Sequence, residues 1–293
     1  MSEKVIKSYK AFDKNMQCRN FQYEVGKEYE MDGEIKCCNR GFHACKNPLE
    51  VWNYYDMLNS RFAEVEQSGK IDEEGDSTKV CSSHIKIKAE LKLADIIKVG
   101  VEWLKDITSP SKFKTDGALN DNGGDSAQIG SSGDYAKIGS SGDYAKIGSS
   151  GNSAQIGSSG YSAQIGSSGN YAQIGSSGYS AKIGSSGDYA QIGSSGDSAQ
   201  IGSSGDYAQI GSSGDYAQID STGEDSVIMC AGNNSIAKAK AGSWITLSEW
   251  KWNNEKSRYI PTCVKTEYVD GENIKADTWY RLKNGKFVEV EDY

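Results

Sequence analysis

A nine-residue repeat in the middle of the chain constrains the fold more than any other feature. Isoleucine recurs at twelve positions spaced nine apart, from Ile129 to Ile228, and alanine stands two residues before the first eleven of them. Side chains two residues apart on a strand point to the same face. Alanine and isoleucine therefore share one face, and the Gln or Lys between them points the other way. The repeat predicts one short strand per nonapeptide.

The repeat "DYAQIGSSG" suggests where each strand and turn lies. We expect Asp-Tyr-Ala-Gln-Ile to form the strand and Gly-Ser-Ser-Gly to form the corner, with the two glycines allowing positive φ there. One strand cannot bury its alanine and isoleucine alone, whereas stacked copies pair through backbone hydrogen bonds and enclose a thin core. The middle of the chain is therefore predicted to be a β-solenoid.

The size of the core residues favours one number of repeats per coil. Two nonapeptides per coil are favoured over three, because alanine and isoleucine on facing strands fill a narrow core without larger side chains. Six such coils would span roughly 29 Å at about 4.8 Å per strand. A Gly/Ser linker has no need of regularly spaced isoleucine. A calcium β-roll is disfavoured because the acid is replaced at Asn152, Tyr161, Asn170 and Tyr179.

The repeat degenerates after Ile219. The bulky run from Val227 to Cys230 predicts a capping coil that closes one end of the core, and "WITLSEWKW" from Trp244 to Trp252 predicts a packed cap. The expected domains are an α+β N-terminal domain (1–115), the solenoid with its capping coils (116–243) and a small antiparallel β domain (244–293). The predicted fold class is thus mainly β.

Local patterns predict the elements on either side of the solenoid. We expect strands at 5–12, 23–30, 41–45, 61–71 and 82–93, because these segments are rich in alternating apolar residues. A helix is expected from Asn47, with Asn47 as N-cap and Pro48 in its first turn. Helical spacing predicts a second helix over 94–107, and Asn284-Gly285 predicts a hairpin between "TWYRL" and "FVEVE".

Charge and cysteine usage limit the classes of function. The net charge is −8, of which −4 falls in residues 124–219, where seven Asp and three Lys are the charged residues. Phosphate recognition relies on Lys and Arg, so we expect no direct nucleic-acid binding and a basic partner.

No apolar run approaches the roughly 18 residues that cross a membrane, which predicts a cytoplasmic protein without membrane contact. Seven cysteines, an odd number, predict free thiols and no structural metal.

The N-terminal region offers weak candidates for catalysis. His43 in "GFHAC", Tyr54, Tyr55 and Glu66 in "RFAEVE" faintly resemble the half-site of ADP-ribosyltransferase-like folds, which implies aromatic residues that hold nicotinamide and a glutamate that orients the ribose. A structural role is favoured for His43 and for His84. No Ser-His-Asp order, Walker loop or paired C-x-x-C is present. We therefore assign no catalytic residue and expect no cofactor.

The outward residues of the repeat are the preferred binding surface. Tyrosine and aspartate recur at fixed positions in the repeat, so stacking should gather them into rows on the surface. The predicted contact residues are Tyr135, Asp143, Tyr171, Asp188, Tyr189, Asp206, Tyr207, Asp215 and Tyr216. Trp279 and Tyr280 are further candidates for interface anchors, although core packing is favoured for them.

Several segments together carry a resemblance to a known family. "YKAF", "CRNFQYEVGKEYE", "GFHACKNPLEVWNYY" and "RFAEVE", followed by "AQIGSSGD" repeats and a "VDGENIKADTWYRLKNGKFVEV" tail, resemble an uncharacterised family encoded by bacteriophages and prophages of gut and clostridial bacteria. The N-terminal module of that family is a domain of unknown function. The resemblance implies an accessory phage protein that acts in the host cytoplasm.

Three functions follow from these observations. The preferred one is a non-enzymatic binding protein that inhibits a host defence system, of the anti-CRISPR or anti-restriction type, through direct contact with a nucleic-acid-binding host protein. DNA mimicry is disfavoured, because DNA carries one charge per roughly 1.7 Å of axis, far more than the repeat region offers. The alternatives are a structural virion component and an ADP-ribosyltransferase-like enzyme. Unpaired solenoid ends leave a homodimer open.

Overall fold

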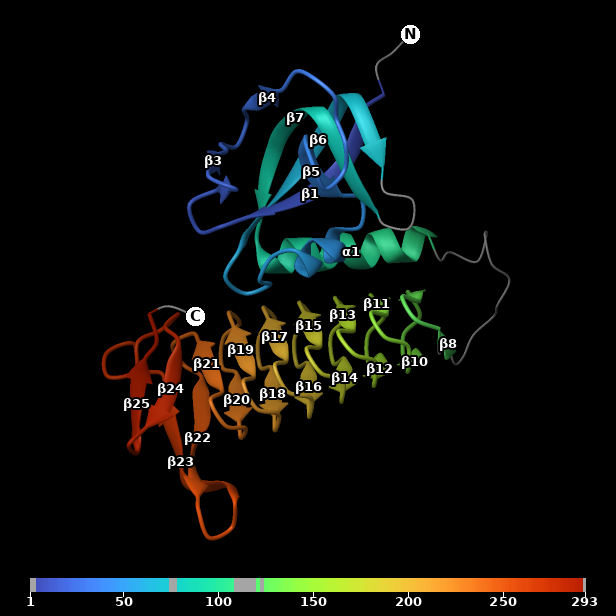
Figure 1. The fold of residues 1–293 in the computed structure, drawn as a ribbon. Helices are drawn as coiled ribbons and strands as arrows, with labels where there is room; N and C mark the ends of the chain where they lie inside the picture. Colours follow the sequence, from blue (N-terminus) through green and yellow to red (C-terminus); the bar gives the residue numbers. More distant parts are fainter. Residues whose placement is uncertain (1–3, 74–77, 108–119, 122–123, 292–293) are drawn as a thin grey trace. The chain divides into compact units, whose positions relative to one another are not determined.

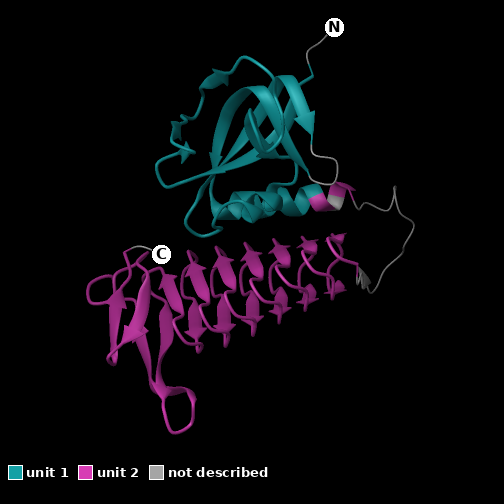
Figure 2. Ribbon diagram, in the orientation of Figure 1, with its two compact units in different colours: residues 1–103 teal, residues 104–293 magenta. Residues whose placement is uncertain are grey.

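The structure is a computed structural model that describes residues 4–73, 78–107, 120–121 and 124–291. It divides into two compact units, residues 1–103 and 104–293 (Figure 2), here named the N-terminal unit and the C-terminal unit. The three-domain division stays a prediction, and its boundary between residues 115 and 116 falls outside the described residues. No helix in the described part of the chain has the length and apolar character needed to cross a membrane.

Four antiparallel strands of the N-terminal unit close into a ring. They are β1 (Ile6–Phe12), β5 (Phe42–Cys45), β6 (Arg61–Glu73) and β7 (Lys79–Leu91), and the pairs β1–β5, β1–β6, β6–β7 and β5–β7 complete the closure. A short fifth strand, β4 (Glu28–Glu30), pairs with β7 next to the segment of β7 that pairs with β5. The closed sheet gives the N-terminal unit its own apolar interior.

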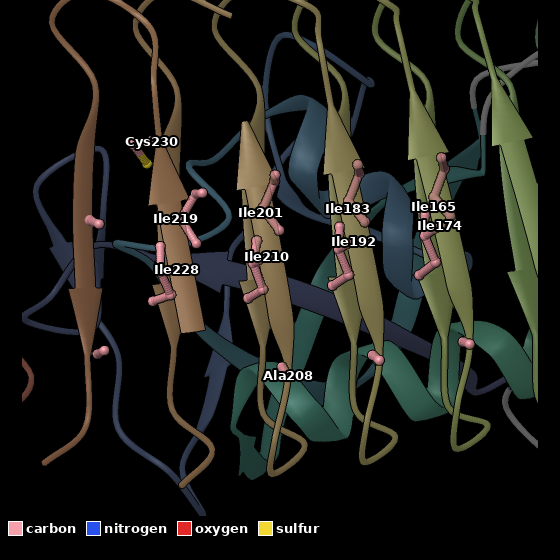
Figure 3. Close-up of a cluster of buried hydrophobic side chains, with 14 of the residues drawn as sticks. Ile165, Ile174, Ile183, Ile192, Ile201, Ala208, Ile210, Ile219, Ile228 and Cys230 are labelled. Atoms are coloured by element: carbon pink, nitrogen blue, oxygen red, sulfur yellow. The ribbon is translucent and has the colours of Figure 1, made fainter. Parts of the chain in front are cut away.

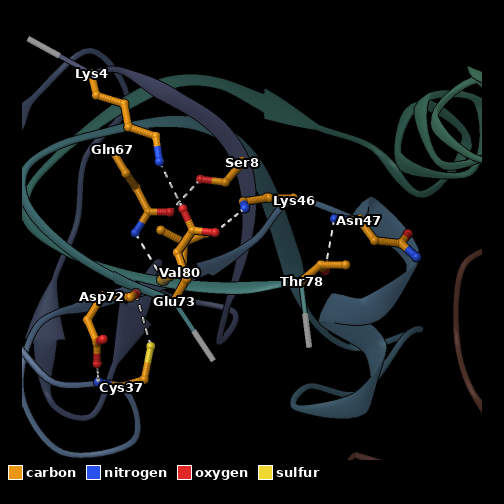
Figure 4. A network of polar contacts seen from close by, with 10 residues as sticks. All are labelled: Lys4, Ser8, Cys37, Lys46, Asn47, Gln67, Asp72, Glu73, Thr78 and Val80. Carbon is orange, nitrogen blue, oxygen red and sulfur yellow. Dashed lines mark hydrogen bonds and ion pairs between the residues drawn. The ribbon is translucent and has the colours of Figure 1, made fainter. Parts of the chain in front are cut away.

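The interior of this unit combines apolar side chains with one buried polar network. Phe12, Val65 and Ile85 are fully buried. Among them lies the Gln67 amide, which accepts a hydrogen bond from the Ser8 hydroxyl (2.7 Å) and donates to the backbone oxygens of Phe42 (2.7 Å) and Val80 (3.2 Å). Figure 4 shows the bond from Ser8 beside the surface ion pairs of Glu73 with Lys4 and Lys46. The network satisfies polar atoms that burial would otherwise leave unpaired.

The helices differ in part from expectation. Asn47 caps a helix as predicted, its side chain accepting from the backbone N–H of Leu49 (3.0 Å), but the element is a 3-10 helix, η1 (Pro48–Asn53), and ends before Tyr54. The second helix, α1 (Leu93–Ile107), is confirmed, with its apolar stripe buried. A side chain at Gly100 of α1 would lie 2.5 Å from Leu49, so glycine lets α1 pack closely on η1.

The strand expected at 23–30 is wrong over most of its length, because only β4 forms there. Gly26 has a φ of +85°, which turns the chain out of the extended conformation just before β4. A small hairpin of β2 (Gln17–Cys18) and β3 (Phe21–Gln22) precedes this segment. The turn between the two strands places Arg19 and Asn20 at positive φ, a local feature that apolar periodicity does not reveal.

The C-terminal unit contains the β-solenoid that the repeat predicts. Each repeat strand pairs in parallel with the strand eighteen residues later, as Ile156 with Ile174 and Ile174 with Ile192, so two nonapeptides form each coil. About seven turns run over residues 128–247. The first solenoid sheet contains β8 (Asn120–Asp121), β10 (Lys137–Ser140), β12 (Gln155–Ser158), β14 (Gln173–Ser176), β16 (Gln191–Ser194), β18 (Gln209–Ser212) and β20 (Val227–Cys230). The second contains β9 (Gln128–Ser131), β11 (Lys146–Ser149), β13 (Gln164–Ser167), β15 (Lys182–Ser185), β17 (Gln200–Ser203), β19 (Gln218–Ser221) and β21 (Ile236–Ala239).

The solenoid core is a thin layer between these two sheets. Figure 3 shows the isoleucines of the two sheets facing one another in adjacent rows. Ile165, Ile183 and Ile201 of the second sheet are fully buried, and the isoleucines from Ile138 to Ile210 of the first sheet are 3–4% exposed. The alanines from Ala145 to Ala217 are also fully buried. The predicted alanine and isoleucine core is therefore confirmed.

The expected placement of strand and turn within the repeat is wrong. Figure 1 shows the short repeat strands, each followed by a turn. The strand is Gln/Lys-Ile-Gly-Ser, and the turn lies over Ser-Gly-Asp-Tyr. The residue before each core alanine, Tyr or Ser, adopts the left-handed conformation, with φ between 54° and 58° from Ser126 to Tyr216. The repeat glycines do not. This non-glycine residue reverses the chain, and the cost of its conformation is offset by the hydrogen bonds that lock each coil to the next.

The two glycines of Gly-Ser-Ser-Gly have different roles. A Cβ on the second, from Gly142 to Gly232, would lie 1.9–2.2 Å from the carbonyl oxygen of the glycine eighteen residues earlier. The second glycine is therefore required by the close approach of successive coils. On the first solenoid sheet, a Cβ on the first glycine, as at Gly193, would meet nothing within 4 Å. That position faces open space.

Two hairpins end the solenoid, one on each sheet. β22 (Trp244–Asn253) continues the first sheet in parallel with β20 and then pairs antiparallel with β23 (Arg258–Tyr268). β24 (Tyr280–Lys283) joins the second sheet and pairs with β25 (Lys286–Glu289) through the predicted Asn284-Gly285 turn.

The expected capping run only partly fills the core. Ile228 and Cys230 are buried, but Val227 and Met229 point outward and are 47% and 52% exposed, because the two-residue alternation of β20 continues unchanged. The end of the core is closed by Val269, Ile274, Tyr280 and Leu282, all of which are buried within the same apolar cluster. Trp244 and Trp252 of the expected packed cap are about half exposed.

The two glycine environments predict different effects of alanine substitution on the stability of the protein. Gly196→Ala would place a Cβ 2.0 Å from the Gly178 oxygen and should destabilise the protein by about 1–3 kcal/mol, as overpacking does. Gly193→Ala adds the methyl in open space and should change stability by less than about 0.5 kcal/mol. Urea unfolding of both variants, followed by circular dichroism, measures the difference. Equal effects would contradict the close approach of the coils.

Candidate functional site

The turns of successive coils stack into two edges, which divide the predicted contact residues between them. The first edge carries Tyr135, Tyr171, Asp188, Tyr189, Asp206 and Tyr207. The second edge carries Asp143, Asp215 and Tyr216. The structure therefore does not gather all nine predicted residues into one surface, because consecutive nonapeptides place their turns on different edges of the coil.

Stacked tyrosines form a continuous ladder on the first edge. The rings of Tyr171 and Tyr189 are 5.0 Å apart and nearly parallel (6°), and those of Tyr189 and Tyr207 are 4.9 Å apart (11°). This spacing is close to the separation of paired strands. The three side chains remain 56%, 44% and 46% exposed. Tyr135 stands apart because Ser153 occupies the intervening coil. We call Tyr171, Tyr189 and Tyr207 the tyrosine ladder.

The residue before each ladder tyrosine bonds the next coil. The Asp188 carboxylate accepts from the backbone N–H of Asp206 (3.0 Å), and the Asn152 and Asn170 amide oxygens accept from Asn170 (3.0 Å) and Asp188 (2.9 Å) in the same way. From Asp134 to Asp206 this edge carries only Asp or Asn at the position, and either residue supplies the acceptor oxygen, whereas Tyr161 and Tyr179 take the equivalent position on the second edge. Sequence reasoning treated these acids only as surface charge, although the asparagines at the same position were the available signal.

The open face of the first solenoid sheet forms a groove of about 960 Å³. Its floor is the row of first glycines, including Gly157, Gly175 and Gly193, and glutamine side chains line it. The exposed side chains of Val227 and Met229 lie at its end. Sequence reasoning missed this groove because it placed the first glycine in a corner.

The shared role of Asp and Asn generates a prediction. Asp188→Asn keeps an acceptor oxygen for the Asp206 N–H, so the stability of the protein should stay within about 0.5 kcal/mol of the parent value. Asp188→Ala leaves that backbone donor without its bond and should destabilise the protein by about 1 kcal/mol. Denaturant unfolding of the two variants separates the cases. An Asn variant as unstable as the Ala variant would show that the charge itself is needed.

The N-terminal unit contains a separate pocket of about 540 Å³. Five basic side chains line it, and no carboxylate does so among the described residues. The bases come from different segments: Lys10 from β1, Arg19 from the turn after β2, Arg40 from the segment before β5, His43 from β5, and Lys79 from β7. The pocket therefore concentrates positive charge in a protein whose net charge is −8.

Lys10 lies at the bottom of this pocket. Its side chain is buried, and its ammonium group donates to the backbone oxygen of His43 (2.9 Å) and contacts the Cys18 sulfur at 3.6 Å. Burial lowers the pKa of Lys10. Burial also lowers the pKa of His43, and the positive charges of Lys10 and Arg19 lower it further. An anion in the pocket would favour the charged forms of both residues.

Aromatic side chains form much of the remaining wall. Tyr55 donates its hydroxyl to Cys18 (2.7 Å), and Tyr54 lies under the Lys79 ammonium group, 4.5 Å from it. Burial raises the pKa of Tyr55 and of Tyr23. The tyrosine hydroxyls therefore stay protonated at neutral pH and act as donors or as neutral surfaces.

The structure brings His43, Tyr54 and Tyr55 together in this pocket but not Glu66. Glu66 lies on β6, outside the pocket lining, and pairs with Lys88 at 3.0 Å. His84, in turn, contacts the Ser68 hydroxyl (2.8 Å), as expected of a structural histidine. Glu66 therefore lies apart from the aromatic residues with which the resemblance grouped it. Sequence reasoning missed Lys10 and Arg19, which have no motif to mark them.

Comparisons with known proteins gave a match for the N-terminal unit alone. Residues 6–99 match the model of a domain of unknown function, DUF7666. No curated protein and no solved structure matches the chain. The expectation of an N-terminal domain of unknown function is therefore confirmed, and the phage origin stays a prediction.

Proposed function

We propose that the protein is a non-enzymatic binding protein whose solenoid is a rigid scaffold, and that the tyrosine ladder contacts a basic host protein directly. The observation that carries the proposal is the row of three stacked, half-exposed tyrosines flanked by Asp188 and Asp206. Tyrosine supplies large contact area at low entropic cost, and it is enriched at the centres of interfaces.

The coils do not need the ladder in order to stack. Ser153, Ser162, Ser180 and Ser198 occupy the same left-handed position in other coils with the same φ. Backbone bonds to the next coil form at those positions as well. Tyrosine at 171, 189 and 207 therefore adds a surface property beyond what folding demands, which supports a role in recognition.

The chemistry of the ladder favours a basic partner. Tyrosine faces attract Arg and Lys side chains through cation–π contacts. Asp188 and Asp206 lie beside these faces, and the repeat region carries a net charge of −4, which steers a basic surface toward the protein. We propose the nucleic-acid-binding defence proteins of a phage host as this partner class, because phosphate-binding surfaces are rich in Arg and Lys. Inhibition would then follow from occupation of that surface.

A triple variant tests the ladder. Tyr171→Ser, Tyr189→Ser and Tyr207→Ser together install the residue that the chain already uses at this position, so the fold should be kept. Tyrosine is enriched among the interface residues whose loss costs more than about 1 kcal/mol, so removal of all three should weaken binding at least tenfold. The measurement is quantitative capture of host proteins by the tagged full chain, followed by titration of each captured protein against both forms.

The second edge provides the matched control. Tyr144→Ser with Tyr216→Ser removes exposed tyrosines outside the ladder and should leave capture unchanged. A captured partner should be basic, and the full chain should inhibit its nuclease or nucleic-acid-binding activity. Capture that the triple variant leaves intact, or the absence of any specifically captured host protein, would overturn the proposal.

A further inference from the structure

We propose that the pocket of the N-terminal unit binds a small ligand in which a phosphate group is joined to a flat ring, the chemistry of a nucleotide. The pocket lies within this unit and shares no residue with the tyrosine ladder. It therefore constitutes a second binding function, independent of the proposed contact with a host protein.

The arrangement of charge specifies the anionic part of the ligand. Lys10 is 5% exposed, and its ammonium contacts a carbonyl oxygen, a thiol and the ring faces of Phe12 and Tyr23, none of which is an anion. A buried cation is costly unless an anion compensates it. Arg19 and Arg40 line the same cavity, where the Arg40 guanidinium also donates to the Asp32 backbone oxygen (2.7 Å). Guanidinium groups suit phosphate because their planar forks donate paired hydrogen bonds. Phosphate in the pocket would supply the compensating charge.

The aromatic wall specifies the rest of the ligand. Phe21, Tyr23, Tyr54 and Tyr55 line the pocket beside the bases. Flat rings of a ligand stack favourably on such side chains. The volume of about 540 Å³ falls within the range of small-molecule sites, roughly 300–1,000 Å³. An inorganic anion alone would leave most of this space and the aromatic wall unused.

The fold holds this site in place. Lys10 lies on β1 and His43 on β5, neighbouring strands of the closed ring, and the hydrogen bond between the Lys10 side chain and the His43 backbone joins them. The His43 ring accepts from the Cys38 backbone N–H (3.0 Å), which ties the segment before β5 to the same wall. Lys10, His43 and Lys79 therefore project from strands of the closed sheet, which favours a preformed binding site.

Calorimetric titration of the full chain tests the proposal. The probes are ADP, GDP, CDP and UDP, with pyrophosphate as the anion alone and adenosine as the ring alone. At least one nucleoside diphosphate should bind at least tenfold more tightly than pyrophosphate and adenosine. Failure of all four diphosphates to bind, or equal affinity for pyrophosphate, would overturn the assignment.

Variants locate the binding in the pocket. Arg19→Gln changes an exposed side chain that lines the pocket and should weaken diphosphate binding at least tenfold without affecting the fold. Lys10→Met removes the charge, keeps most of the volume of the buried side chain and should weaken diphosphate binding further. Lys27→Gln removes an exposed charge of the same unit outside the pocket lining and should leave affinity unchanged. Equal effects of Arg19→Gln and Lys27→Gln would show that binding is non-specific attraction and overturn the proposal.

Discussion

The parallel pairing of each residue with the residue eighteen positions later is the constraint on which the C-terminal unit depends. It places equivalent repeat positions above one another, so a residue that recurs at one position in successive coils forms a row along the stack. Isoleucine on isoleucine creates a continuous core, and tyrosine on tyrosine creates the ladder. Because each coil bonds mainly to its neighbours, stability grows with the number of coils, as in other repeat proteins.

The close spacing of the coils explains residue choices that appear redundant in the sequence. The second glycine of each repeat is needed where coils approach one another, whereas the first glycine of the first solenoid sheet faces open space. The Asp or Asn position provides an oxygen that bonds the next coil. The Tyr or Ser residue must adopt the left-handed backbone conformation, but the stacking of the coils does not constrain its side chain. Variation is therefore concentrated where the side chain leaves the stack, which is the surface available for binding.

Sequence reasoning predicted the solenoid, its core residues and two repeats per coil, because the period of nine and the spacing of Ala127 and Ile129 encode burial directly. It misplaced the turn, because glycine was assumed to supply positive φ where Tyr and Ser do so. The tyrosine row was predictable from the repeat, but its separation from the second edge needed the coil register. The pocket around Lys10 was not predictable, since its residues come from strands and turns that only the closed sheet brings together.

Amide hydrogen exchange of the intact protein tests the central claim most directly. If consecutive nonapeptides form one hydrogen-bonded stack, the amides that donate to neighbouring coils, such as Gln173 to Ala154 and Gln191 to Ala172, should be strongly protected. Protection should be similar from coil to coil in the middle of the stack and weaker toward residue 128. Exchange of these amides at the rate of an unstructured peptide would contradict the solenoid, and with it the ladder on its edge.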